Sequence, residues 1–262
     1  MFFFAVFSLL TVNSVKADEV NINSLEREGP ISSKIQNFQG IRNFRELGDG
    51  TNSFRVKFPA GSYDPMSMQK RSLQYGGMNF RYKPGGLYKE SCSIVQYYVR
   101  FPSDFDFVKG GKLPGLFGGE GNTGGKIPNG SDGFSVRILW TKDGKGQIYA
   151  YLPSSKKWGT GLAKNTWTFS RGQWTKVTML VQLNSPNHTD GKIRLWIGGE
   201  KVAELANVVF RNNENLLING LLFSTFFGGN NSSFAPRTDQ YIDFKNVMIS
   251  KNISPEMRCS DD

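Results

Sequence analysis

The chain contains 262 residues and has a formal net charge of +10, with 32 Lys and Arg residues against 22 Asp and Glu residues. One large domain can account for this length, and no segment beyond the N-terminus has the ~20 consecutive apolar residues of a transmembrane helix. The excess of cations favours a polyanionic partner. The cations are dispersed, without a basic block or a nucleic-acid-binding motif, which argues against nucleic acid and against a membrane surface.

The first 17 residues form a mainly apolar run that ends in Val15-Lys16-Ala17. A short apolar run that ends in a small residue is typical of a signal peptide, although this one lacks the usual basic start. We therefore expect a secreted, extracellular protein whose signal peptide spans residues 1–17. Residues 18–50 are polar and are predicted to form a partly ordered N-terminal arm. Residues 51–262 are predicted to form a single monomeric domain.

Short runs rich in Phe, Tyr, Val, Ile and Trp alternate with Gly, Asn and Pro, which indicates many strands joined by turns. In chain order, the predicted strands are residues 53–58, 93–101, 134–140, 147–152, 174–183, 192–197, 217–227 and 241–249. Helical periodicity is nearly absent. This pattern predicts an all-β jelly-roll β-sandwich of two antiparallel sheets.

Side chains alternate between the two faces of a strand, and four of the predicted strands have one polar side. The polar positions are Arg55 and Lys57; Gln96, Tyr98 and Arg100; Ser135 and Arg137; and Gln147, Tyr149 and Tyr151. Their apolar neighbours, such as Val56, Val136 and Ile148, are predicted to form the core. Because no carboxylate occurs on these polar sides, a polyanion-binding face is favoured over an ordinary solvated face, which sheets also commonly have.

Cys92 and Cys259 are the two cysteines of the chain. An even pair in a secreted chain is consistent with a disulfide, and the sequence alone leaves open whether they are bonded. Glycosylation sequons begin at Asn129, Asn187, Asn230, Asn231 and Asn252, as expected of a secreted surface.

Several other patterns have the residue types of a catalytic or metal site. The one histidine, His188, lies in a hydrophilic turn, so neither a serine-hydrolase triad nor a histidine metal site is supported. No His, Cys or carboxylate cluster has ligand spacing, so we expect no metal and no other cofactor. Asp104 and Asp106 are the residue type that glycoside hydrolysis needs, but we expect them to face solvent. Residues 119–124 match G-x-G-x-x-G without a following helix and are interpreted as a turn.

The most distinctive segment is Lys109-Gly110-Gly111-Lys112-Leu113-Pro114-Gly115-Leu116-Phe117-Gly118-Gly119. With Ser53-Phe54-Arg55-Val56-Lys57-Phe58 and Thr225-Phe226-Phe227-Gly228-Gly229, it resembles polysaccharide lyase family 14, the alginate and glucuronate lyases. The resemblance implies a jelly roll with a concave polysaccharide-binding cleft. It also implies that this cleft is lined by a Lys before Leu-Pro-Gly, a Ser-x-Arg strand and a Tyr-x-Tyr strand. Here these residues are Lys112, Ser135, Arg137, Tyr149 and Tyr151.

The resemblance implies a polysaccharide lyase that cleaves a polyuronate, alginate or polyglucuronate, by β-elimination and leaves an unsaturated uronate. Lys112 and Arg137 are expected to neutralise the carboxylate and stabilise the enolate-like transition state. Tyr149 and Tyr151 are expected to serve as base and acid, provided that nearby cations lower a tyrosine pKa from about 10. Ser135 is expected to be a positioning hydrogen-bond partner, and further substrate-binding residues are expected at Arg55, Lys57, Gln96, Tyr98 and Arg100.

Two other functions fit the same residues. A non-catalytic jelly roll would bind an acidic glycan and use the tyrosines as stacking platforms, and a glycoside hydrolase would use carboxylates instead. The identity of the uronate, the endo or exo mode, and the assignment of base and acid between the two tyrosines stay open at this point. The three functions differ in their product, because only elimination creates a new carbon-carbon double bond.

Overall fold

The computed structural model describes residues 17–20 and 34–259, so residues 1–16 of the predicted signal peptide lie outside the described residues. The strands are β1 (Asp18–Glu19), β2 (Ile35–Gln39), β3 (Phe44–Glu46), β4 (Ser53–Phe58), β5 (Met78–Tyr82), β6 (Cys92–Arg100), β7 (Gly110–Gly119), β8 (Gly133–Thr141), β9 (Gly146–Tyr151), β10 (Thr160–Leu162), β11 (Trp174–Gln182), β12 (Gly191–Ile197), β13 (Glu200–Val208), β14 (Ile218–Phe227), β15 (Gln240–Ser250), β16 (Asn252–Ser254) and β17 (Met257–Arg258). The helical segments of the described part are α2 (Pro65–Lys70) and the 3-10 turns Ile41–Asn43, Pro84–Gly86, Lys142–Gly144 and Ser232–Phe234.

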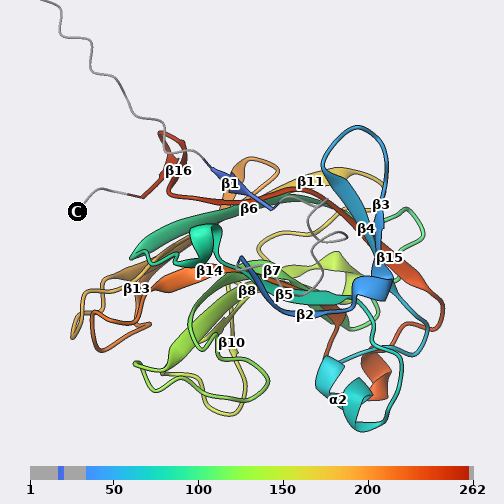
Figure 1. Ribbon diagram of the computed structural model, residues 1–262, viewed down its shortest axis with the longest axis horizontal. Helices are drawn as coiled ribbons and strands as arrows, with labels where there is room; N and C mark the ends of the chain where they lie inside the picture. The colour runs from blue at the N-terminus through green and yellow to red at the C-terminus, as the bar shows by residue number, and fades with distance from the viewer. Residues whose placement is uncertain (1–16, 21–33, 260–262) are drawn as a thin grey trace, which may run out of the picture.

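Two large antiparallel sheets are stacked face to face (Figure 1). Within the described residues, sheet A has the order β13-β12-β11-β6-β15-β4-β3, with β1 also paired to β15. Sheet B has the order β10-β9-β8-β7-β14-β5-β2, and β16 and β17 form a separate hairpin. This arrangement confirms the predicted jelly-roll sandwich. No helix in the described part of the chain is long and apolar enough to cross a membrane.

The core lies between the two sheets and is strongly aromatic. β4 contributes Phe54, Val56 and Phe58, and β8 contributes Val136, Ile138 and Trp140, all at most 1% exposed. At one end of the sandwich, Phe227 stacks against Phe105 and meets Trp140 edge-on, with ring centroids 5.6 and 5.4 Å apart. Burial of each large apolar side chain stabilises the fold by about 1.5–3 kcal/mol. The polar residues of the same strands therefore face outward.

All eight predicted strands are present, with ends that differ from the prediction by at most one residue. The prediction missed several strands, among them the long strands β7 and β13, and β7 lies in the middle of sheet B. Its glycines and Pro114 are turn signals in a sequence, but here the glycines permit close packing. A Cβ on Gly111 would lie 2.1 Å from the ring of Trp140, and one on Gly115 would lie 1.9 Å from the carbonyl oxygen of Val136. Pro114 lies where the register of β7 against β8 shifts, as expected of a bulge.

Cys92 of β6 and Cys259 form a disulfide bond. The sequence alone left open whether these two cysteines are bonded. The bond attaches the β16–β17 hairpin to sheet A. A small apolar cluster surrounds it and includes Leu180, Trp196 and Met257. The hairpin is short, with its two strands spanning Asn252–Ser254 and Met257–Arg258, so the disulfide is its principal covalent restraint.

Replacing both cysteines, Cys92→Ala with Cys259→Ala, should lower the free energy of unfolding by about 2–4 kcal/mol, because the bond closes a long loop in the unfolded chain. The two residues are 167 positions apart. Urea unfolding followed by tryptophan fluorescence measures this change. Met257→Ala is the matched control, since it trims the same cluster and keeps the bond. If Met257→Ala were equally destabilising, packing of the hairpin rather than the cross-link would explain the effect.

Candidate active site

The five residues implied by the resemblance lie on three neighbouring strands of sheet B. Lys112 is on β7, Ser135 and Arg137 are on β8, and Tyr149 and Tyr151 are on β9. Ser135 is registered opposite Tyr151 and Arg137 opposite Tyr149, so each pair shares a face of the sheet. Residues between them on β8 and β9 are buried in the core. The five side chains therefore belong to the outer face of sheet B, which we call the polar face of sheet B.

Lys112 is partly exposed, and its amine has a pKa below that of an ordinary lysine. Its Nζ donates to the carbonyl oxygen of Gly228 at 3.4 Å and lies 5.2 and 5.4 Å from the ring centroids of Tyr149 and Phe226. Burial among these groups, and then repulsion by Arg137, lower the pKa of Lys112 to about 7, against the opposing effect of Asp64. A substantial fraction of the amine is thus neutral near pH 7.

Arg137 is only 3% exposed. Its Nη1 donates to Ser224 Oγ at 3.3 Å, and its Nε is buried without a hydrogen-bond partner. No ion pair of Arg137 or Lys112 occurs among the described residues. Burial lowers the pKa of Arg137, but a guanidinium stays protonated in proteins. A buried, unpaired cation is energetically costly, and an anionic ligand relieves that cost.

The two tyrosines differ in their surroundings. Their rings are perpendicular, with centroids 5.7 Å apart. Tyr151 is 2% exposed, and its hydroxyl accepts a hydrogen bond from the backbone N–H of Gly125 at 3.0 Å. Tyr149 is partly exposed, and burial, followed by the influence of Tyr151, raises its pKa above the ordinary value despite Arg137. The expectation that nearby cations lower the tyrosine pKa is therefore wrong for Tyr149, because desolvation outweighs the single charge beside it.

Ser135 is completely buried, and its Oγ donates to the carbonyl oxygen of Asn122 at 2.6 Å. Together with the bond from Gly125 to Tyr151, this contact fastens the loop after β7 to β8 and β9. Residues 120–124 of the G-x-G-x-x-G match form part of this loop, and Gly119 ends β7. The structure thus gives Ser135 and Tyr151 a role in holding the loop, while Lys112 and Tyr149 remain accessible.

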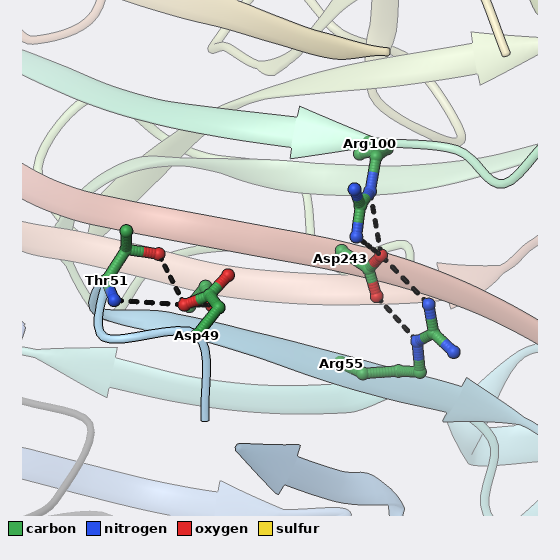
Figure 2. A network of polar contacts seen from close by, with 6 residues as sticks. Asp49, Thr51, Arg55, Arg100 and Asp243 are labelled. Atoms are coloured by element: carbon green, nitrogen blue, oxygen red, sulfur yellow. Dashed lines mark hydrogen bonds and ion pairs between the residues drawn. The ribbon is translucent and has the colours of Figure 1, made fainter. Parts of the chain in front are cut away.

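The other predicted substrate-binding residues lie on the opposite side of the sandwich. Arg55, Lys57, Gln96, Tyr98 and Arg100 are on β4 and β6 of sheet A. Figure 2 shows Arg55 and Arg100 both bound to Asp243 of β15, with N–O distances of 2.7 and 2.8 Å. Lys57 pairs with Asp239 at 2.6 Å. The prediction of one shared polar face is wrong, because the four strands belong to two sheets whose outer faces point in opposite directions.

The two outer faces differ in how their cations are neutralised. On sheet A, the neighbouring strand β15 supplies the carboxylate of Asp243, which the alternation within β4 and β6 did not reveal. On sheet B, Lys112 and Arg137 contact carbonyl and hydroxyl oxygens and aromatic rings instead. The unpaired cations mark the polar face of sheet B as the candidate site for an acidic ligand.

Two residues of β14 complete this site and were missed in the sequence. Ser224 accepts from Arg137, and Phe226, registered opposite Lys112, covers the lysine amine. Residues 217–227 were predicted as a strand, so the alternation of side chains along this strand could have placed Ser224 and Phe226 on its outer face.

The remaining candidates lie elsewhere. His188 is exposed, with Nδ1 2.9 Å from the carbonyl oxygen of Pro186, and Asp104 and Asp106 are exposed. A cavity lined by Gln182, Lys192, Arg194 and the C-terminal hairpin includes none of the five site residues. No group of three or more His, Cys, Asp or Glu residues that could hold a metal ion occurs in the described part of the chain. Metal independence stays a prediction.

Solved structures of known proteins share the fold of this chain. The marine PL-14 alginate lyase from Aplysia kurodai is 28% identical with a TM-score of 0.73, and the match covers 92% of this chain and 97% of that one. An alginate lyase from Chlorella virus is 23% identical with a TM-score of 0.75, covering 90% and 99% of the two chains. The endo-β-1,4-glucuronan lyase from the fungus Trichoderma reesei is 14% identical with a TM-score of 0.55, covering 92% of each. A search of curated protein sequences gave no match.

The family model described as polysaccharide lyase 14 matches residues 47–247, which is well over half of the chain. The match includes all three strands that carry Lys112, Arg137 and Tyr149. The sandwich, the ordered Lys, Arg and Tyr strands, and this match lead to one conclusion: the chain belongs to polysaccharide lyase family 14 and is a polysaccharide lyase.

Proposed function

We propose that the protein cleaves a polyuronate, alginate or polyglucuronate, by β-elimination at the polar face of sheet B. The observation that carries the proposal is the buried guanidinium of Arg137, which has no carboxylate partner among the described residues. A uronate carboxylate supplies the missing anion. The alginate and glucuronan lyases with the same fold support this class of substrate.

Elimination places three demands on the site. The proton on C5, next to the carboxylate, must be removed, and its bonding electrons form the C4=C5 double bond. The C4–O bond breaks, and the leaving oxygen must receive a proton. Because negative charge builds up on the carboxylate side in the transition state, a cation held close to that carboxylate lowers the barrier.

The pKa shifts favour Lys112 as the base and Tyr149 as the acid. A base is most effective when its pKa lies near the working pH, and the pKa of Lys112 is about 7. The raised pKa of Tyr149 keeps its hydroxyl protonated and able to donate to the leaving oxygen. Arg137 then holds the carboxylate, while Ser135 and Tyr151 position the loop and the Tyr149 ring. This role for Lys112 is proposed in place of charge neutralisation at the carboxylate, and the pH dependence of kcat/KM distinguishes the two roles.

Secretion is part of the same proposal. Disulfides persist in oxidising compartments and are rare in the cytosol, and Cys92 and Cys259 are bonded. The five asparagines that begin sequons are all exposed, so glycans can be accommodated there. An extracellular enzyme would also meet polymeric uronates directly.

The proposed function is tested by incubating the mature protein with polymannuronate, polyguluronate and polyglucuronate and following ultraviolet absorbance. Elimination creates an unsaturated uronate, so absorbance should rise on at least one polymer. New reducing ends without absorbance would mean hydrolysis, and binding without either product would mean a glycan-binding protein. Addition of a chelator should leave the rate unchanged.

Tyr149→Phe should reduce kcat by about 10²-fold or more, the usual scale for general acid-base catalysis. The substitution keeps the ring that packs against Tyr151 and Lys112, so thermal stability should stay close to that of the wild type. His188→Ala, in an exposed turn remote from sheet B, is the control and should keep full activity. A fully active Tyr149→Phe variant would remove Tyr149 from the mechanism.

The value of kcat/KM should rise as the pH increases through about 7. The free enzyme must present Lys112 as a neutral amine, and its pKa is about 7, so the protonated form below that pH is inactive. Lys57→Ala, which removes an ion-paired lysine from sheet A, should leave the profile unchanged. A kcat/KM that instead falls above pH 7 would show that Lys112 acts as a charged group at the carboxylate.

A further inference from the structure

Arg81 of β5 also belongs to the outer face of sheet B, four strands away from Tyr149. Its neighbours along β5, Phe80 and Tyr82, are buried in the core, so Arg81 points the other way. The strand registers connect Arg81 to Leu222 on β14, Leu222 to Gly115 on β7, and Gly115 to Arg137 on β8. Arg81 and Arg137 therefore lie in the same row across the sheet.

Within residues 17–20 and 34–259, the guanidinium of Arg81 forms no ion pair with a carboxylate. It lies over the ring of Phe117, 5.1 Å from the centroid, and its Nη2 donates to the backbone carbonyl of Glu120. The carboxylate of Glu120 is paired with Lys126 instead. Burial lowers the pKa of Arg81, with Glu120 acting in the opposite direction.

The guanidinium of Arg81 retains N–H donors that can bind an anion. A guanidinium carries five N–H donors and matches a carboxylate with two parallel hydrogen bonds. Among the described residues Arg81 makes one hydrogen bond, to the backbone carbonyl of Glu120, so that part of the chain leaves most of its donors available to a ligand. The loop comes close enough that a Cβ on Gly121 would lie 3.0 Å from Nη2. Arg81 is thus fixed by the same loop that Ser135 and Tyr151 attach to β8 and β9.

The distance between the two arginines fits the repeat of the polymer. Three strand-to-strand steps separate them, which places their Cα atoms roughly 14 Å apart. A 1,4-linked pyranose unit is about as long as the ~5 Å separation of neighbouring strands. We consider a polyuronate that crosses the strands with one carboxylate bound at Arg137. The carboxylate about two or three units further along the same chain then lies within reach of Arg81.

We propose that Arg81 forms a distal subsite that binds a second uronate carboxylate of the same chain. The inference rests on the proposed function, because it takes the polyuronate as ligand and Arg137 as the origin of the row. The bond is made equally in the ground state and the transition state, so it acts on affinity rather than on chemistry. Substrates too short to reach Arg81 do not benefit from it.

The test compares kinetics on uronate oligomers of increasing length. Arg81→Met keeps a side chain over Phe117 and removes the charge, so KM for long oligomers should rise about tenfold or more with kcat nearly unchanged. The shortest cleavable oligomer should show no change. Arg81→Lys should restore part of the affinity. Arg45→Met is the control, since it removes one exposed cation from β3 on sheet A and should leave every KM unchanged.

Other outcomes overturn the inference. An equal rise in KM for all lengths would mean a general charge effect, and a fall in kcat for all lengths would mean that Arg81 only positions the loop. Calorimetric titration of the same oligomers separates this question from the catalytic one. If the wild type binds oligomers without releasing unsaturated product, the proposed function fails, while the length-dependent loss of affinity in Arg81→Met still decides the role of Arg81.

Discussion

The site depends on a guanidinium that is buried without an anion beside it. Arg137 is held on β8 with Ser224 as its hydrogen-bond partner, and its charge is felt by the groups around it. Burial lowers the pKa of Lys112 and Arg137 lowers it further, while burial raises the pKa of Tyr149 and Arg137 opposes that rise. A single unpaired charge in a poorly solvated position thus influences the protonation state of both groups that the proposed mechanism uses.

Glycine packing in β7 brings these groups together. Gly115 is registered opposite Arg137, and Gly111 lies against the ring of Trp140, so β7 fits closely between β14 and β8. This places Lys112 opposite Phe226 and near Tyr149. The loop that follows β7 is tied back to the same sheet by Ser135 and Tyr151. Backbone features that would be turn signals in isolation therefore build the most important strand of the site.

The two faces of the sandwich use cations in different ways. On sheet A, Asp243 is fully buried and neutralises Arg55 and Arg100, which makes an internally satisfied network. On sheet B, Arg137 and Arg81 meet a hydroxyl, a carbonyl oxygen and aromatic rings. Cations of the second kind retain attraction for an external anion, so pairing, more than the number of cations, separates a binding face from a structural one.

The sequence by itself determined eight of the strands, the inward and outward residues of those strands, and the order of the Lys, Arg and Tyr motifs, because these follow from local alternation and from contiguous segments. Only the tertiary structure decided which sheet each polar strand joined. Arg55 and Asp243 are 188 residues apart, and no pattern within a strand reveals such a partner. Burial among side chains from several strands likewise lowers the pKa of Lys112 and raises that of Tyr149. Desolvation depends on neighbours that meet only in the folded protein.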